Sequence, residues 1–441
     1  MVLSGFSNRG RWLSRSALGI ALAAGVVAGG TLVASPALAK KAESAPKLKP
    51  SKGFVAIAGP LQKALAELAP DDPAAVAAIR TQLDQAFAAV EVEDDRYYAG
   101  TFAVNLGGKL KEPALQRRGI KAMLESGKSG ADEPRYNSIA GQLAYQAGDY
   151  AEAQAYLQRA IDGGFAEDNV QALLAEAFIA NNQPEKGLAM LESAILAGRT
   201  SGTLAPESWY RRGLASAYKA NSIAHAAKFG QMFIEDYPAS ANVGMAATIV
   251  RELGNFGSQE TLDLMRLMGR SNSYAEQRDY VEYIQAADPR RLPGEVLDVL
   301  NAGLAAGKLK ASDPFVSDAK SQVNERIAGD KASLPAYVKD ARKPGASEAT
   351  VTGAADALLS YGDPGPAEEL YQIALGKPGV DTQRVLTRLG IAQVDQGKYA
   401  AAQETFAKVT GMRAPIAKLW TGYAKSKAAP PAAKPAAAPV D

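Results

Sequence analysis

Few residues of this chain could take part in catalysis or bind a metal. The sequence has no cysteine and one histidine, His225. Zinc sites built from Cys and His, and Cys–His or Ser–His nucleophile pairs, therefore depend on that one residue. His225 lies in a stretch with helical apolar spacing, where we expect its side chain to face solvent or the outer wall of the helix. Acidic residues are plentiful, so a pair of catalytic carboxylates cannot be identified by counting.

Three short motifs have a chemical and a structural interpretation. Residues 125–129 (ESGKS) resemble a phosphate-binding loop, but Ala122 stands where that loop needs glycine and no apolar strand precedes it, so we predict a turn between helices. The acidic run 91–95 lacks the spacing of a calcium loop and is predicted to start a helix, where negative charge is favourable. The pairs Arg211–Arg212 and Arg290–Arg291 are interpreted as solvated surface charges. We predict no catalytic residue, no metal and no cofactor.

The N-terminus has the pattern of an export signal. Arginines at 9, 11 and 15 precede an apolar run over 17–33, and Ala37-Leu38-Ala39 gives the small residues of a cleavage site. We expect cleavage after Ala39 and export to the periplasm. A retained membrane anchor is the alternative, but as a helix the apolar run would span only about 25 Å, less than the ~30 Å hydrocarbon core.

Charge is unevenly distributed along the chain. Residues 40–53 and 425–441 are rich in Lys, Ala and Pro, and we predict a disordered linker and a disordered tail there. The whole chain carries a formal charge of +2, so once the basic signal, linker and tail are set aside the body is acidic. An acidic body argues against nucleic acid as the partner.

The body shows an internal repeat. Apolar residues recur at three- and four-residue spacing, with Gly, Pro or Asp-Pro punctuation and without alternating strand-like runs. At a shift of 34 residues, Gly141, Ala160, Ile161 and Gly164 recur as Ala175, Ala194, Ile195 and Gly198. A period near 34 is typical of repeated helix pairs.

These positions give the chain a resemblance to the tetratricopeptide repeat family. The best match is Leu389-Gly390, Gly397, Tyr399, Ala402 and Phe406, and a second is Gly141, Gly148, Tyr150, Ala153, Leu157 and Ala160. The resemblance implies an all-α fold, a right-handed superhelical solenoid of antiparallel helix pairs that is diverged in the middle. The predicted parts are a signal peptide at 1–39, a linker at 40–53, N-terminal repeats at 54–238, degenerate helical repeats at 239–345, C-terminal repeats with a capping helix at 346–424, and a tail at 425–441. A separate helical insert is the alternative for the middle part.

The motif residues have packing roles. Gly148 and Gly397 are expected to take left-handed backbone angles in tight turns. Small residues such as Gly141 should let the two helices of a pair approach closely, while Leu157 and Phe406 should fill the gap to the neighbouring pair. One such pair is too small to fold unaided, so stacking of pairs must supply the core.

The resemblance also implies a binding groove. First helices of each repeat line the concave face in this family, and alignment carries the groove positions onto Arg135, Gln142, Tyr145, Glu176, Ile179, Arg211, Tyr218 and Lys219. Aromatic and arginine anchors among polar neighbours suit an extended or helical peptide. We therefore predict a non-enzymatic periplasmic scaffold or adaptor that binds another envelope protein or peptide, with no nucleic acid and no membrane span after cleavage. The alternatives are an accessory subunit of outer-membrane assembly, secretion or polysaccharide export, and a peptidoglycan-active enzyme or its accessory domain.

Overall fold

A computed structural model describes residues 48–167 and 169–428. Those residues form helices and connecting turns, with no β-strand among them. The predicted signal peptide, its cleavage site, and most of the predicted linker and tail lie outside the described residues. The chain divides into two compact units between Asn181 and Asn182. None of the helices between 48 and 428, residue 168 aside, has the length and apolarity needed to cross a bilayer.

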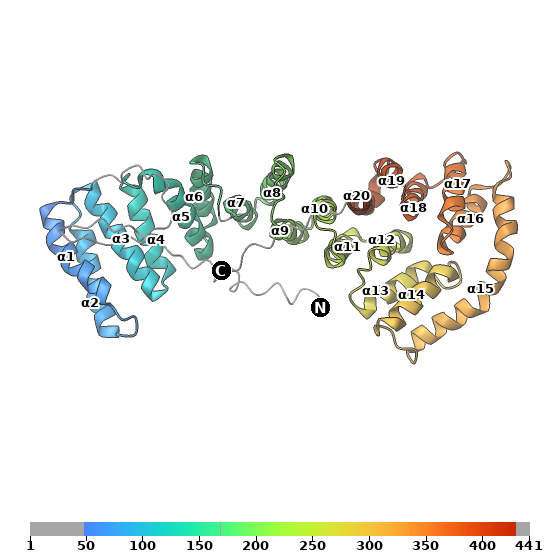
Figure 1. Cartoon of the computed structure of the whole chain (residues 1–441), viewed down its shortest axis with the longest axis horizontal. Helices are drawn as coiled ribbons and strands as arrows, with labels where there is room; N and C mark the ends of the chain where they lie inside the picture. Colours follow the sequence, from blue (N-terminus) through green and yellow to red (C-terminus); the bar gives the residue numbers. More distant parts are fainter. Residues whose placement is uncertain (1–47, 168, 429–441) are drawn as a thin grey trace. The chain divides into compact units, whose positions relative to one another are not determined.

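Unit 1 is a row of helices joined by short connections (Figure 1). Its helices are α1 (Lys52–Glu67), α2 (Pro73–Ala88), α3 (Glu93–Leu110), α4 (Pro113–Glu125), α5 (Glu133–Ala147), α6 (Tyr150–Asp162) and α7 (Val170–Ala180), with a short 3₁₀ turn, η2 (Gly130–Asp132), before α5. Each helix packs on the next along the chain, and the closest pairs are α3 with α4 and α5 with α6. This neighbour-by-neighbour packing is the arrangement of a helical solenoid.

Unit 2 begins in the same way. Its helices are α8 (Pro184–Thr200), α9 (Glu207–Lys219), α10 (Ile223–Asp236), α11 (Ser240–Gly254), α12 (Ser258–Arg270), α13 (Gln277–Ala287), α14 (Pro293–Ala305), α15 (Pro314–Ala341), α16 (Glu348–Ser360), α17 (Pro364–Leu375), α18 (Thr382–Asp395), α19 (Tyr399–Phe406) and α20 (Ala414–Ala428), with the 3₁₀ turn η3 (Gly411–Arg413) before α20. Within this unit the last helices return to the first ones. Helix α20 lies along α10 and also touches α11 and α12, and α18 touches α12 (Figure 1). The unit therefore closes on itself, in addition to the packing between chain neighbours.

The repeat glycines act as the sequence predicts. Gly148 has φ 85° and Gly397 has φ 73°, so both occupy the left-handed region in turns between paired helices. A Cβ on Gly141 would lie 2.5 Å from Leu157, and one on Gly390 would lie 2.4 Å from the ring of Phe406. The large side chains thus pack onto the glycine within their own helix pair, and the Phe406 ring also stacks at 6.1 Å on Trp420 of the following helix, α20. The reason is that a helix with no side chain at that point leaves a hollow that only the facing helix can fill.

The ends of the folded part differ from the predicted linker and tail. Helix α1 begins at Lys52, capped by the side chain of Ser51, and the backbone N–H groups of Lys49 and Ser51 donate to the carboxylates of Asp94 and Asp95. The chain from 48 onward is therefore held against the start of α3, because those two carboxylates satisfy its backbone donors. At the other end, α20 continues to Ala428, past the predicted start of the tail.

The repeat boundaries at 238/239 and 345/346 stay a prediction. Helices α10 and α11, on either side of the first boundary, pack directly on each other. The second boundary follows α15, a helix much longer than one repeat helix.

Candidate functional site

The groove residues predicted in unit 1 lie on two helices that touch. Arg135, Gln142 and Tyr145 are on α5, and Glu176 and Ile179 are on α7. Arg135 is exposed and the other four are half-buried. The spacing of three or seven residues places the members of each set on one face of their helix. The ring of Tyr145 lies 5.4 Å from that of Tyr150, at the start of α6.

The groove residues predicted in unit 2 are all on α9, and two of them, Arg211 and Tyr218, have polar partners within the unit. The guanidinium of Arg211 donates to Glu207 and to Asn242, each at 2.7 Å, and lies 5.3 Å from the centre of the Phe233 ring. The negative charge of Glu252 raises the pKa of Tyr218, with burial and a hydrogen bond adding to it. Lys219 is exposed. The eight predicted residues thus fall into two groups, one in each unit, and their role in binding stays a prediction.

The short motifs have structural roles. Residues 125–129 form the turn between α4 and η2, where the hydroxyls of Ser126 and Ser129 both donate to the carbonyl of Met123 and Lys128 pairs with Asp94 at 3.0 Å. This confirms the predicted turn between helices. The acidic run starts α3, and the carboxylate of Asp95 accepts from the backbone of Glu91 and Val92. His225 is half-buried on α10 and its Nδ1 lies 2.9 Å from the hydroxyl of Ser222.

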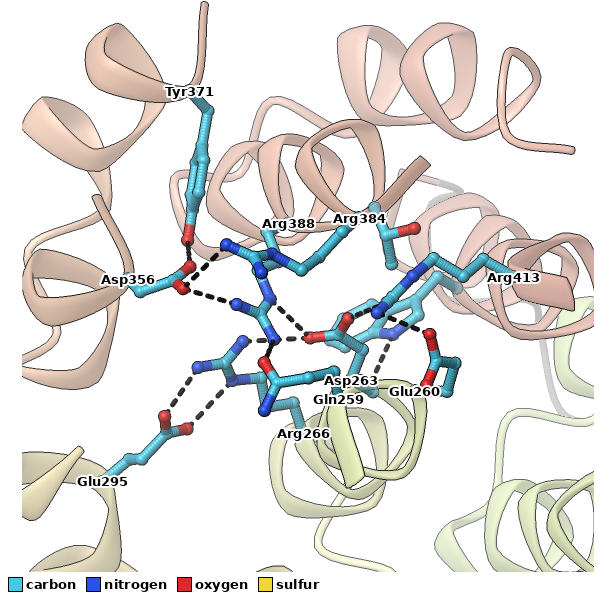
Figure 2. A network of polar contacts seen from close by, with 12 residues as sticks. Gln259, Glu260, Asp263, Arg266, Glu295, Asp356, Tyr371, Arg384, Arg388 and Arg413 are labelled. Atoms are coloured by element: carbon cyan, nitrogen blue, oxygen red, sulfur yellow. Dashed lines mark hydrogen bonds and ion pairs between the residues drawn. The ribbon is translucent and has the colours of Figure 1, made fainter. Parts of the chain in front are cut away.

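Sequence reasoning missed a buried network of charged side chains inside unit 2 (Figure 2). At its centre is Asp263 of α12, which has no exposed surface. One carboxylate oxygen accepts from Arg266 at 3.0 Å and from Arg388 at 3.1 Å, and the other pairs with Arg413. Three guanidinium groups from three parts of the chain therefore converge on one carboxylate.

Further carboxylates balance those arginines. Glu295 of α14 holds Arg266 in a two-bonded fork at 2.9 and 2.6 Å, the geometry in which guanidinium and carboxylate bind most strongly. Asp356 of α16 pairs with Arg388 at 2.6 Å and also accepts from the hydroxyl of Tyr371 at 2.7 Å. The network thus joins α12, α14, α16, α17, α18 and η3.

The electrostatics of the network favour fixed charges. Burial alone would raise the pKa of Asp356, but the positive charges of Arg388 and Arg266 outweigh it and hold that pKa below its ordinary value of 3.8. Burial and the charge of Asp356 raise the pKa of the Tyr371 hydroxyl well above its usual range. The carboxylate stays ionised and the phenol stays protonated at neutral pH, so this pair is poorly suited to proton transfer. The network is suited to holding helices together.

Helix α12 carries its side of this network as a stripe. Gln259, Asp263, Arg266 and Arg270 are spaced by four, three and four residues, which places them on one face of the helix. Gln259 accepts from Arg388 at 2.7 Å, and Arg270 is bound in a fork by Asp395, at the end of α18, at 3.1 and 2.8 Å.

Helix α20 holds the backbone of α12 at two points. The indole of Trp420 donates to the carbonyl of Asp263 at 2.9 Å. The hydroxyl of Tyr423 donates to the carbonyl of Arg270 at 2.8 Å. Helices α18 and α20 and the turn η3 therefore hold α12 through side-chain and backbone contacts.

The comparisons with known proteins agree with the helix pairs. A family described as tetratricopeptide repeat matches residues 144–203, which run from the end of α5 through α8. A search of curated proteins finds no match. Two independent observations support the repeat. One is the family match over 144–203, and the other is the geometry of the turn glycines and of the close helix pairs at Gly141 and Gly390. The chain therefore contains tetratricopeptide repeat sequence at residues 144–203, and the part that the structure describes has an all-helical, solenoid-like fold; such repeats serve as scaffolds for contacts between proteins.

Proposed function

We propose that this chain is a non-enzymatic scaffold of the bacterial cell envelope that binds a segment of another protein on the α5–α7 face of unit 1. The repeat match and the stacked helix pairs support a protein-binding role. The N-terminal pattern of arginines, apolar run and Ala37-Leu38-Ala39 supports export to the periplasm. The binding would be non-covalent and would need no cofactor.

The contrast between two repeat surfaces carries this proposal. In the C-terminal repeats, Arg388, Asp395 and Trp420 are occupied by α12. On the α5–α7 face, Arg135 is exposed and has no ion pair with any residue that the structure describes, while Gln142 and Tyr145 are partly accessible. Unit 1 therefore presents the accessible repeat surface of the two.

The side chains of this face suit a peptide segment. Tyr145 offers an aromatic ring with two rotatable angles, and tyrosine and arginine are the commonest anchors of protein interfaces. Gln142 carries both a donor and an acceptor for a peptide backbone, and Ile179 adds apolar area on the neighbouring helix. An extended or helical segment laid across α5 and α7 would contact all three.

Photo-crosslinking tests the proposed face directly. A photo-crosslinking amino acid in place of Gln142 is expected to trap a discrete protein partner in envelope preparations, while the same amino acid in place of Ala155, an exposed position on α6, traps little. Combined Arg135→Ala and Tyr145→Ala substitutions should abolish the Gln142 adduct and leave the helical circular dichroism unchanged. Equal crosslinking from both positions, or recovery of peptidoglycan fragments without protein, would overturn the proposal.

A further inference from the structure

A second surface lies beneath α15, in unit 2. This 28-residue helix is buried near its start at Val316, Ala319 and Val323, and near its end at Val338 and Ala341. It packs on α14 at one end and on α16 at the other, and its middle part bridges the two (Figure 1). The bridge leaves a cavity of about 220 Å³. The cavity is lined by Arg291, Leu292, Asp330, Ser333, Leu334, Tyr337, Gly353, Asp356 and Ala357.

Three arginines without carboxylate partners lie at or next to this cavity: Arg291 lines it, and Arg290 and Arg326 are outside its lining. Arg290 and Arg291 lie in the connection between α13 and α14, and Arg326 of α15 donates to the carbonyl of Arg290 at 3.1 Å. All three side chains are exposed, and none has a carboxylate within 4 Å among residues 48–167 and 169–428. Most described arginines do have such a partner; the bidentate pair of Arg342 with Glu369 is an example even at the surface. The sequence interpretation of Arg290–Arg291 as solvated charge leaves the approach of Arg326 unexplained.

A hydroxyl donor lies inside the same cavity. A Cβ on Gly353 would lie 2.3 Å from the Tyr337 hydroxyl oxygen, so the glycine leaves the space that this hydroxyl occupies. The hydroxyl has no hydrogen-bond partner among the residues that the structure describes. It adds a neutral donor to the guanidinium of Arg291 on the cavity wall.

The carboxylates near the cavity already have partners. Asp330 accepts from the hydroxyl of Tyr361 at 2.6 Å, and Asp356 is held by Arg388 and Tyr371 within the buried network. Asp288 accepts from the backbone N–H of Arg290 at 2.9 Å. Among these carboxylates Asp356 has a cationic partner, and Asp330 and Asp288 are held by neutral donors; the polar groups at the cavity without a partner among the described residues are the donors of Arg291 and Tyr337.

We infer that this arginine cluster and the cavity beside it bind an acidic segment of a protein partner. One carboxylate enters the cavity, pairs with Arg291 and accepts from Tyr337, while its aliphatic stem lies against Leu292 and Leu334. Neighbouring carboxylates pair with Arg290 and Arg326 outside. Guanidinium groups bind carboxylates in a planar fork, and clusters of arginines are a recurring means of reading acidic motifs. A space of about 220 Å³ corresponds to about seven waters at ~30 Å³ each, enough for one acidic side chain.

The inference rests on the proposed function only in taking the partner to be a protein. Its test uses a fluorescent hexaglutamate peptide, with hexaglutamine as the neutral control, and the mature full-length chain. Fluorescence anisotropy is expected to show binding of hexaglutamate that weakens at high salt, because exposed charge pairs are screened, and no binding of hexaglutamine.

Matched variants locate the site. Combined Arg291→Gln and Arg326→Gln substitutions are expected to weaken hexaglutamate binding by at least about tenfold, equivalent to losing one strong charged contact. Lys320→Gln with Lys339→Gln removes the same charge from exposed positions on the same helix and should change binding less than about twofold. Tyr337→Phe removes only the hydroxyl and should weaken binding by about threefold. Since the arginines and lysines are exposed, thermal unfolding should be unchanged in both double variants.

Three outcomes would overturn the inference. Equal losses from the arginine and lysine pairs would mean a diffuse charge effect. Displacement of the peptide by millimolar inorganic phosphate, with phosphate binding as tightly as hexaglutamate, would assign the cavity to a small oxyanion. Absence of hexaglutamate binding would remove the site altogether, and would leave the crosslinking result at Gln142 as a separate question.

Discussion

Replacing Asp263 with asparagine should strongly destabilise unit 2. The native carboxylate is fully buried and its two oxygens serve Arg266, Arg388 and Arg413. Asparagine keeps one acceptor oxygen, and its amide group would face guanidinium donors. Removing one partner of a buried ion pair typically costs about 3–5 kcal/mol, because the opposite charge stays buried without compensation. A domain has only about 5–15 kcal/mol of stability, so this loss should bring unit 2 close to unfolding.

Tryptophan fluorescence during denaturant unfolding measures this effect in the correct unit. Both tryptophans in the described residues, Trp209 and Trp420, belong to unit 2, and Trp420 is fully buried against Asp263. Glu369→Gln is the control, since it breaks a bidentate pair with Arg342 whose side chains are 45% and 49% exposed. Surface pairs contribute about 0–1 kcal/mol.

A loss below about 1 kcal/mol for Asp263→Asn, equal to that of Glu369→Gln, would refute this reasoning. It would mean that water or rearranged side chains replace the carboxylate at little cost. Hydrogen exchange gives an independent check, since α12 should lose protection in the variant together with α20, whose Trp420 and Tyr423 hold the α12 backbone.

Two further predictions concern packing and acid. Gly390→Ala should destabilise unit 2 by about 1–3 kcal/mol, because its Cβ would meet the Phe406 ring at 2.4 Å. Gly329→Ala lies at an exposed position of α15 where a Cβ meets nothing within 4 Å, so it should be neutral or stabilise by up to ~1 kcal/mol. Denaturation midpoints of the two variants that move in the same direction would contradict this account. The pKa values of Asp356 and Glu368 lie below their ordinary 3.8 and 4.5, since cationic and amide partners outweigh the effect of burial. A carboxylate whose pKa is lower in the folded than in the unfolded chain stabilises the fold above the unfolded pKa, and this contribution is lost as pH falls through the folded pKa. The denaturant midpoint of unit 2 should therefore stay constant down to about pH 5 and fall below about pH 4, less steeply in Asp356→Asn. A midpoint that rises on acidification would exclude this origin.

The repeat pattern predicted the local structure well. Helical spacing, the turn glycines and the small residue before each second helix depend on neighbours within about one repeat, so the sequence around Gly148 or Gly397 contains the information needed. The same reasoning placed a turn at 125–129 and a helix start in the acidic run. These features follow from backbone angles and caps, which are local.

The closure of unit 2 could not be predicted in this way. Arg388 and Arg413 look like ordinary surface charges in sequence, and their partner Asp263 lies 125 and 150 residues away. Only α12 itself gave a signal. Its apolar residues Leu262, Leu264, Met265, Leu267 and Met268 form a face wider than the ~100° stripe of an ordinary surface helix, and the polar stripe with Asp263 and Arg266 takes the remainder. A helix with so wide an apolar face is expected to be largely buried, and charges on it must then find partners.

The contacts between α20 and α12 affect when unit 2 can fold during synthesis. Trp420 and Asp263 are 157 residues apart along the chain. At about 5–20 residues per second, synthesis of that interval takes roughly 8–30 s, during which the segment around α12 has been made but lacks the helices that bury its charges. An ordinary solenoid can add each new hairpin to the one before it, whereas this half of the molecule can complete its folding only after nearly the last helix has been translated. A premature stop codon that removes only α20 would therefore be expected to prevent stable folding of the segment around α12, which was synthesised long before it.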